Sequence, residues 1–231
     1  MRDQPTSNRE AELPAPTRIG SGDWLGGTVK YQVIYADPPW RYQDAGCNGN
    51  AEGHYNTMSL ADIKALPVAS IAADDAVLLM WATWPLLPEA LQVIEAWGFK
   101  YKSIGFLWVK KNKSDAGFFF GLGRWTRGNS EVCLLATRGK PKRVGNAVSQ
   151  LCFEPLTRHS EKPIVIKEKI VELLGDVPRI ELFCRQRENG WHAFGNEVES
   201  DVQLVPSNGG ADLPPTGARQ PRSGTEGGNG G

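Results

Sequence analysis

Residues 31–40 read YQVIYADPPW, and this stretch decides how the chain is organised. It opens with β-branched and aromatic residues that favour a buried strand. The strand must stop at Asp37, Pro38, Pro39 and Trp40 because proline cannot continue a central strand. Proline also lacks a backbone N–H, so after Asp37 the main chain offers carbonyl acceptors and no donor until Trp40. The sequence therefore predicts a strand that ends in a corner of hydrogen-bond acceptors.

Such a corner suits a ligand group that brings two hydrogens and needs no donor, which describes the exocyclic amino group of a nucleobase. Trp40 would add a flat face on which the base could stack. The structural alternative is a strand followed by a rigid turn, in which Asp37 caps the turn and Trp40 fills the core. The motif on its own does not decide between these two interpretations.

Length and composition indicate one folded domain. The 231 residues, 40% of them hydrophobic, can bury one sizeable core. The formal net charge is zero, so a polyanionic partner must be met by a local basic patch rather than by the charge of the whole chain. The four cysteines form no CxxC pair and only three histidines could help them, which argues against a metal site and against a disulfide framework.

The two ends of the chain differ from its middle. Residues 1–28 are polar with scattered proline and glycine, and residues 200–231 are rich in both. Neither segment can bury enough surface to offset the entropy of ordering it, so we expect two disordered tails and a folded domain at 29–199. No apolar run approaches the ~20 residues of a membrane span, and the N-terminus has no signal-peptide core, which favours a soluble cytoplasmic protein.

Strand and helix patterns alternate through the folded domain. After the opening strand, further strands are predicted at residues 76–82, 101–109, 131–138 and 179–185. Helices are predicted after the capping box that starts at Ser59 and at residues 85–97 and 164–174. This alternation is typical of a mostly parallel α/β sheet with helices on both faces and an antiparallel edge pair where strands follow without helices.

Ligands in such sheets bind at the carboxyl ends of the strands, which puts Asp37 and the residues after Phe183 at the binding edge. Neither a P-loop nor a GxGxxG motif is present, so the sequence predicts neither an NTPase nor a dinucleotide site of the usual kind.

Residues 100–143 carry eleven basic residues against two acidic ones, Asp115 and Glu131. Aromatic and basic residues are interleaved in the expected loop of this segment: Phe118, Phe119, Phe120, Arg124, Trp125 and Arg127. Exposed aromatic rings beside arginines are typical of nucleic-acid contacts. The alternative is a solvated loop whose aromatic rings tuck onto the sheet. We favour nucleic acid, because like charges in one loop are costly without a polyanion.

A set of short motifs, in order over about 165 residues, resembles the DPPW-type adenine N6-methyltransferase family, which includes the catalytic subunit of the mRNA adenosine methyltransferase and bacterial and phage DNA-modifying enzymes. The motifs are YADPPW at 35–40, HYNTM at 54–58, LLMWAT at 78–83, FLWVKK at 106–111, GRWTRGNSEVCLLATRGKP at 123–141, RHSEKP at 158–163, IELFCR at 180–185 and FGNE at 194–197.

The resemblance implies a Rossmann-like methyltransferase fold in circularly permuted order, with the catalytic strand first and the strand that usually leads the cofactor site last. It implies S-adenosylmethionine (SAM) as methyl donor. The family lacks a glycine-rich cofactor loop, so none is expected after Phe183. By position, the residues that resemble the cofactor shell are Asp37, Lys162 within His159–Pro163, Glu181, Leu182, Phe183, Arg185, Arg187, Asn196 and Glu197.

The same resemblance identifies Asp37, Pro38, Pro39 and Trp40 as the catalytic motif. The residues expected to contact the nucleic acid are Tyr55, beside the target adenine, Arg138, near the site, and Lys111, Arg124, Trp125 and Arg127 in the basic loop. Arg187 and Glu188 stand where the eukaryotic relative has a neutral His-Asn pair, and the family's upstream Asp-Ile contact has no clear counterpart here.

Chemistry suggests how such a site would act. The adenine N6 lone pair is delocalised into the ring, and the Asp37 carboxylate and Pro38 carbonyl would draw its hydrogens out of the plane as the methyl group arrives. The base must leave its stack, which indicates base flipping or a single-stranded substrate. DNA is the expected substrate. The alternatives are RNA adenine or another amino group, or a non-catalytic nucleic-acid-binding subunit, and a homo- or heterodimer is compatible with each.

Overall fold

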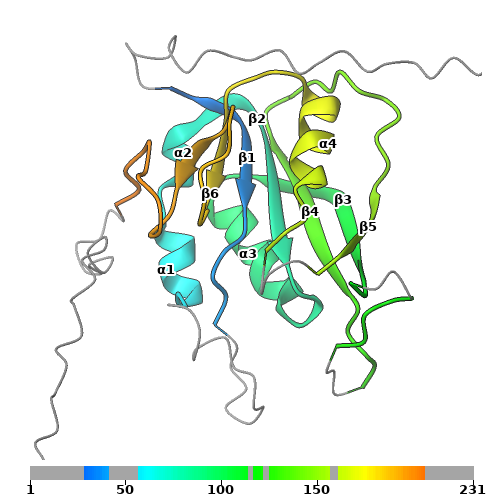
Figure 1. Ribbon diagram of the computed structural model, residues 1–231. Coiled ribbons are helices and arrows are strands. Elements are labelled where there is room, and N and C mark those ends of the chain that lie inside the picture. The colour runs from blue at the N-terminus through cyan, green and yellow to red at the C-terminus, as the bar shows by residue number, and fades with distance from the viewer. Residues whose placement is uncertain (1–28, 42–56, 114–116, 122–124, 157–160, 206–231) are drawn as a thin grey trace, which may run out of the picture.

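Figure 1 shows a computed structural model of the chain. It describes residues 29–41, 57–113, 117–121, 125–156 and 161–205. The expected tails at 1–28 and beyond 205 lie outside the described residues. Residues 200–205, which the sequence places in the C-terminal tail, pack on the domain: Leu204 is buried, and the Asp201 carboxylate accepts a hydrogen bond from the Ala193 amide at 2.7 Å.

A seven-stranded sheet forms the centre of the described chain, in the order β5-β3-β4-β2-β1-β6-β7. Its strands are β1 (Tyr31–Ala36), β2 (Ala72–Ala82), β3 (Lys100–Lys111), β4 (Ser130–Arg138), β5 (Leu151–Pro155), β6 (Arg179–Leu182) and β7 (His192–Phe194). Strand β4 is antiparallel to its neighbours β2 and β3, and the other pairings are parallel. The predicted mostly parallel α/β sheet is confirmed.

Helices cover both faces of this sheet (Figure 1). They are α1 (Leu60–Ala65), α2 (Val68–Ile71), the short 3-10 helix η2 (Trp84–Leu86), α3 (Leu87–Ala96) and α4 (Val165–Leu174). Ile63 of α1 and Val93 of α3 belong to one buried cluster, whereas Ile166 of α4 belongs to the other. Ser59 starts α1 as the capping box predicts, since its hydroxyl accepts from the Asp62 amide at 3.1 Å.

Several sequence expectations need correction. Strands β5 and β7 and helix α2 were not predicted, because segments of three to five residues carry too little periodicity to be recognised. The last predicted strand does not reach residue 185: β6 ends at Leu182, and Phe183 takes a left-handed backbone conformation with φ 64°. The antiparallel pair β3–β4 is not at the edge of the sheet, because β5 pairs with the outer side of β3.

The strand directions distinguish the two ends of the sheet, which lie where its strands begin and where they finish. We call the side where β1, β2, β3, β5 and β6 end and β4 begins the carboxyl edge; it holds Asp37, Lys111, Glu131 and Phe183. The opposite side, the amino edge, holds Lys100 at the start of β3 and Arg138 at the end of β4. None of the described helices is long and apolar enough to cross a membrane.

Candidate active site at the carboxyl edge

The turn after β1 forms the acceptor corner that the sequence predicts. The Trp40 amide, the first backbone donor after Asp37, donates back to the Pro38 carbonyl at 2.8 Å, a tight three-residue turn. The Pro39 carbonyl accepts from the Met58 amide at 2.9 Å. Pro38 is buried, and its carbonyl oxygen has a second lone pair besides the one that Trp40 uses. The Asp37 side chain is 30% exposed, so it is not sealed in the core.

Trp40 does not offer a flat face to a base, and this part of the prediction is wrong. Trp40 as a whole residue is only 9% exposed, and it belongs to the core cluster on the α1 and α3 face. Its Nε1 donates to the Trp81 carbonyl at 3.1 Å, which fixes the ring against β2. The structural interpretation therefore holds for Trp40, whereas Asp37 beside it faces the edge of the sheet.

A chain of alternating charges runs from Asp37 across the carboxyl edge. The Lys162 Nζ lies 2.7 Å from the Asp37 Oδ2 and 3.3 Å from the Glu131 Oε2. The other oxygen of Glu131 lies 2.5 Å from the Lys110 Nζ. Lys162 and Glu131 are only 12% and 16% exposed, so these charges interact with little screening by water. Sequence reasoning identified Asp37 and Lys162 and missed Glu131 and Lys110 as members of the site.

These contacts shift the pKa values of the groups involved. Burial raises the pKa of the Asp37 carboxyl above its ordinary value, and Lys162 opposes this shift. Burial also acts on Glu131, but Lys162 and Lys110 outweigh it and hold its pKa below the ordinary value. Burial disfavours the charged form of Lys162, yet Asp37 and Glu131 together raise its pKa. Lys162 therefore stays a cation between two carboxylates of unequal acidity.

Two buried tryptophan rings lie against the ammonium groups of this row of alternating charges. The Lys162 ammonium lies 5.5 Å from the ring centre of Trp81, and the Lys110 ammonium lies 5.2 Å from that of Trp108. The Trp81 Nε1 donates to the Tyr35 hydroxyl at 2.6 Å, and burial raises the pKa of Tyr35 well above its ordinary value. Both tryptophan rings are buried, so they fix where the two ammonium groups can sit.

The end of β6 lies next to Asp37. The two strands are parallel neighbours, and the Asp37 amide approaches the Leu182 carbonyl at 3.5 Å. Leu182 itself is buried in the core. The Glu181 carboxylate pairs with the Lys167 Nζ of α4 at 2.7 Å, and burial raises the pKa of Glu181.

Phe183 adds a strained turn to this edge. A side chain with positive φ costs about 1 kcal/mol, and here the ring is held between Trp97 and Phe194 at centroid distances of 6.5 and 6.2 Å. Gly195 packs so closely behind the turn that a Cβ would lie 2.1 Å from the Cys184 carbonyl. Strain of this kind is concentrated at binding sites.

The remaining residues predicted for the cofactor lie beyond this turn. Arg185 and Glu197 approach each other at 3.8 Å and are both partly exposed, with Asn196 beside Glu197 in the segment after β7. Arg187 is engaged elsewhere: its guanidinium is held by the Asp201 carboxylate at 2.8 and 2.9 Å. The structure therefore brings Lys162 to 2.7 Å from Asp37, places Glu181 on the neighbouring strand in an ion pair with Lys167, and ties Arg187 to the C-terminal segment.

The residues predicted to contact nucleic acid do not all reach the carboxyl edge. Lys111 at the end of β3 does, and so do Trp125, which is 98% exposed, and the exposed Arg127 in the segment before β4. Tyr55, Arg124, His159 and Ser160 lie outside the described residues.

Arg138 is not near the site, contrary to the prediction. Arg138 pairs with Ala76 whereas Cys133 pairs with Trp81 beside the site, so about 17 Å of β4 separates Arg138 from that level. The Arg138 guanidinium instead donates to the Ala69 carbonyl of α2 at 2.8 Å.

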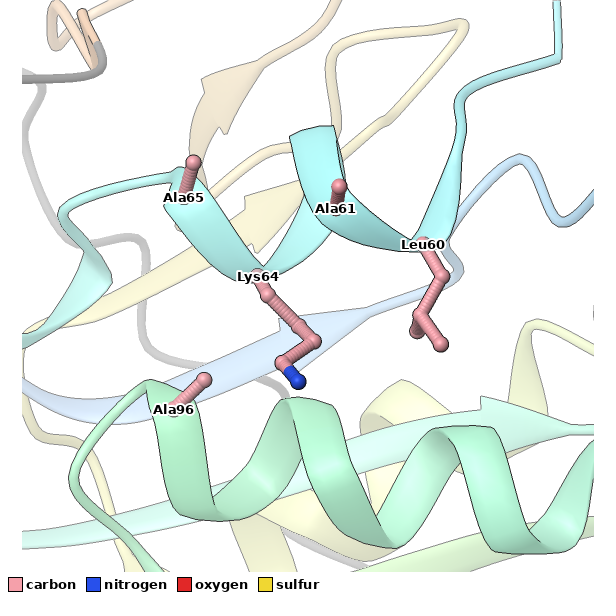
Figure 2. Close-up of a pocket in the computed structure, with 5 residues that line it drawn as sticks. All are labelled: Leu60, Ala61, Lys64, Ala65 and Ala96. Atoms are coloured by element: carbon pink, nitrogen blue, oxygen red, sulfur yellow. The ribbon is translucent and has the colours of Figure 1, made fainter. Parts of the chain in front are cut away.

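The described chain offers no second site among its predicted residues or its metal-binding side chains. A hollow between α1 and α3 is lined by Leu60, Ala61, Lys64, Ala65 and Ala96, and Figure 2 shows these side chains on the two helices. It contains none of the predicted site residues. Within the described ranges, no group of three His, Cys, Asp or Glu side chains is placed to hold a metal ion.

The chain is similar to known proteins over most of its length. The family model described as MT-A70 matches residues 31–197. The chain is 33% identical over 204 residues to the type II methyltransferase M.MunI of Mycoplasma sp, which covers 79% of this chain and 84% of that protein. It is 25% identical to a putative N(6)-adenosine-methyltransferase MT-A70-like protein of Medicago truncatula, over 87% of this chain and 33% of the other.

A third relative is the N(6)-adenine-specific methyltransferase METTL4 of Mus musculus, which is 26% identical over 73% of this chain and 37% of its own length. The chain thus spans most of the Mycoplasma protein and about a third of the plant and mouse relatives.

Proposed function

The chain belongs to the MT-A70 family, and on this premise we propose that it is a SAM-dependent methyltransferase that transfers a methyl group to the N6 amino group of adenine in DNA. The observation that carries the proposal is the position of Asp37. Its partly exposed carboxylate lies in a turn whose backbone donor is already used, and it stands beside the end of β6. The names of the relatives, which specify adenine or adenosine N6, support the same reaction.

The residues at the carboxyl edge fit SAM, which carries a sulfonium, an ammonium and a carboxylate. The Lys162 ammonium has three N–H groups, and two of them face Asp37 and Glu131. The third N–H can donate to the carboxylate of SAM. Asp37 supplies negative charge for a cationic group, and Arg185, Asn196 and Glu197 offer polar contacts beyond β6. When bound, SAM supplies an electrophilic methyl group.

Asp37 and Pro38 would activate the target nitrogen. The Asp37 carboxylate and the second lone pair of the Pro38 carbonyl accept the two hydrogens of the adenine amino group and turn them out of the ring plane. This localises the lone pair on N6, which would bond to the methyl carbon while the bond from that carbon to sulfur breaks and its electron pair stays on the sulfur of the departing thioether. The carboxylate also stabilises the positive charge that develops on nitrogen, and because burial raises the pKa of Asp37 it is a suitable acceptor for the proton lost afterwards.

DNA is proposed rather than RNA because the match to the Mycoplasma type II methyltransferase covers most of both chains. To reach Asp37 at the end of β1, the adenine must leave its stack. Tyr55 is the proposed stacking partner for the flipped base, since the Trp40 ring is buried. Trp125, Arg127 and Lys111 are proposed to contact the strand around it, and such a substrate agrees with the predicted cytoplasmic location.

The test is transfer of a labelled methyl group to double-stranded DNA, single-stranded DNA and RNA, followed by digestion to identify the modified nucleoside. We expect N6-methyladenine in DNA, and a loss of at least about 1,000-fold in the Asp37→Ala variant because an acceptor for the amino hydrogens is removed. Asp74→Ala, which removes an exposed carboxylate at the amino edge, is the matched control and should keep full activity.

Three results would contradict the proposal: near wild-type transfer by Asp37→Ala, a labelled product other than N6-methyladenine, or preferential transfer to RNA. Nucleic-acid binding without SAM binding would instead favour a non-catalytic subunit.

A further inference from the structure

The eleven basic residues of segment 100–143 do not form one patch, because the β3–β4 pair carries them to opposite sides of the sheet. Lys110 and Lys111 stand at the carboxyl edge. Lys100, at the other end of β3, pairs with Thr137 near the end of β4. Lys100 pairs with Thr137 and Val109 with Ser130, and two register shifts shorten β3 against β4, so Lys100 and Lys111 lie about 30 Å apart at roughly 3.3 Å per residue.

Five exposed cations form what we call the amino-edge patch: Lys100, Lys102, Lys140, Lys142 and Arg143. The loop that carries the last three is anchored at both ends. The Lys140 amide donates to the Asp75 carboxylate at 2.7 Å, and the Val144 amide donates to the Leu173 carbonyl at the end of α4 at 2.9 Å. The backbone therefore holds these side chains on the outside of the sheet.

The patch is poorly neutralised. Asp74 and Asp75 are the acidic residues beside it on β2, against five cations, and Glu172 lies where the loop meets α4. Among the described residues, none of the five cations forms an ion pair with a carboxylate closer than 4.0 Å, in contrast to Lys110 and Lys162. Clustered like charges on a rigid surface attract a polyanion.

We propose that the amino-edge patch binds the phosphate backbone of duplex DNA that extends beyond the target base, an inference that rests on the proposed function. A duplex advances 3.4 Å per base pair, so the roughly 30 Å between the two edges corresponds to about 9 base pairs. The patch is a second contact for a long substrate, and it adds affinity without touching the reacting base. It contributes only when the duplex beyond the target base is long enough to reach it.

The variant that tests this carries Lys140→Gln, Lys142→Gln and Arg143→Gln. The first measurement is binding of a duplex of about 40 base pairs at several salt concentrations. Each lost phosphate contact lowers the slope of log K against log salt by about 0.9, so we expect a slope smaller by about 2 to 3. Lys64→Gln, on α1, is the control and should leave the slope unchanged. An unchanged slope in the triple variant would overturn the proposal.

The second measurement is kcat/KM for duplexes of about 14 and about 40 base pairs with the methylated adenine at the centre. We expect the triple variant to match the wild type on the short duplex and to lose at least about 10-fold on the long one. An equal loss on both lengths would also overturn the proposal. If the wild type methylates no DNA, the proposed function fails, and the salt slope still decides whether the patch binds a duplex.

Discussion

The two edges of the sheet use the same two strands in opposite ways. At the carboxyl edge, β3 and β4 contribute Lys110 and Glu131, which lie 2.5 Å apart, are mostly buried and belong to a chain of alternating charges. At the amino edge, the same strands contribute Lys100, Lys102 and the loop after Arg138, whose cations are exposed and unneutralised by ion pairs within the described chain. The charges at the carboxyl edge are neutralised by each other within the protein, whereas the cations at the amino edge face the solvent and can bind a ligand.

This difference predicts which property each edge controls. Buried charges must be compensated, so removal of one member of the carboxyl-edge chain affects both the fold and the chemistry. Exposed cations contribute little to stability and act over distance, so their removal affects the affinity for a polyanion and its salt dependence. Substitutions at each edge can therefore be scored separately for unfolding free energy and for methyl transfer.

Among the substitutions that compare stability with transfer at the two edges, the largest effect is expected for Lys162→Gln. Without the ammonium, Asp37 loses the cation that lies 2.7 Å from it and Glu131 keeps only Lys110, so the free energy of unfolding should fall by about 2 to 4 kcal/mol. Transfer should fall by at least about 100-fold, since the carboxyl edge also loses the donor proposed for SAM. Urea unfolding and single-turnover transfer measure the two effects.

Lys64→Gln is the control for this substitution and should stay within about 0.5 kcal/mol of the wild type. A Lys162→Gln protein with wild-type stability and wild-type transfer would show that the carboxyl-edge charges are not interdependent, and the contrast between the edges would disappear.

An intermediate effect is expected for Gly139→Ala at the amino edge. Gly139 has φ 63°, and a Cβ there would lie 2.2 Å from the Asp75 Oδ1 and 2.3 Å from the Asp74 carbonyl. Gly117 has φ 82° with nothing within 4 Å of its Cβ position. Gly117→Ala therefore measures the cost in unfolding free energy of a positive φ alone, without a steric clash. We expect losses of about 3 kcal/mol for Gly139→Ala and about 1 kcal/mol for Gly117→Ala in urea unfolding.

Transfer to a short duplex by Gly139→Ala, measured well below its unfolding temperature, should match the wild type. A fall in kcat comparable to that of Lys162→Gln would contradict the separation of stability from chemistry at the amino edge.

The sequence predicted the fold class and the acceptor corner because both depend on local residues. The proline pair fixes where β1 ends, and buried apolar runs identify β2 and β4. The family resemblance is confirmed by the match over residues 31–197. The burial of Trp40 depended instead on a tertiary contact with Trp81, which lies 41 residues away and has no sequence signature.

The chain of charges could not be predicted for a similar reason. Glu131 looked like an isolated acid in a basic segment, and its partners lie at positions 110 and 162, on another strand and before a helix. The two-sided distribution of basic residues was missed because sequence proximity suggested one patch, whereas the length of β3 separates its two ends. In both cases strand register, which the sequence left open, decided the outcome.

The smallest and most specific effect is expected for Glu131→Gln. Transfer requires ionised Asp37, so kcat/KM should rise with pH along a limb that lies above the ordinary aspartate range, because burial raises the pKa of Asp37. Glu131 adds to that rise through repulsion and shares Lys162, so its neutralisation should lower the pKa of Asp37 and move the limb to lower pH.

The opposite substitution gives the opposite sign, which makes the effect distinguishable from a loss of packing. Lys162→Gln removes the cation that opposes the rise, so the residual activity should show a limb at higher pH. Arg185 and Glu181 also act on Asp37 but are unchanged in both variants, and Glu95→Gln on the outside of α3 controls for net charge. Limbs that coincide in Glu131→Gln and wild type would mean that Glu131 does not act on Asp37, and the carboxyl edge would then be two independent ion pairs rather than one chain.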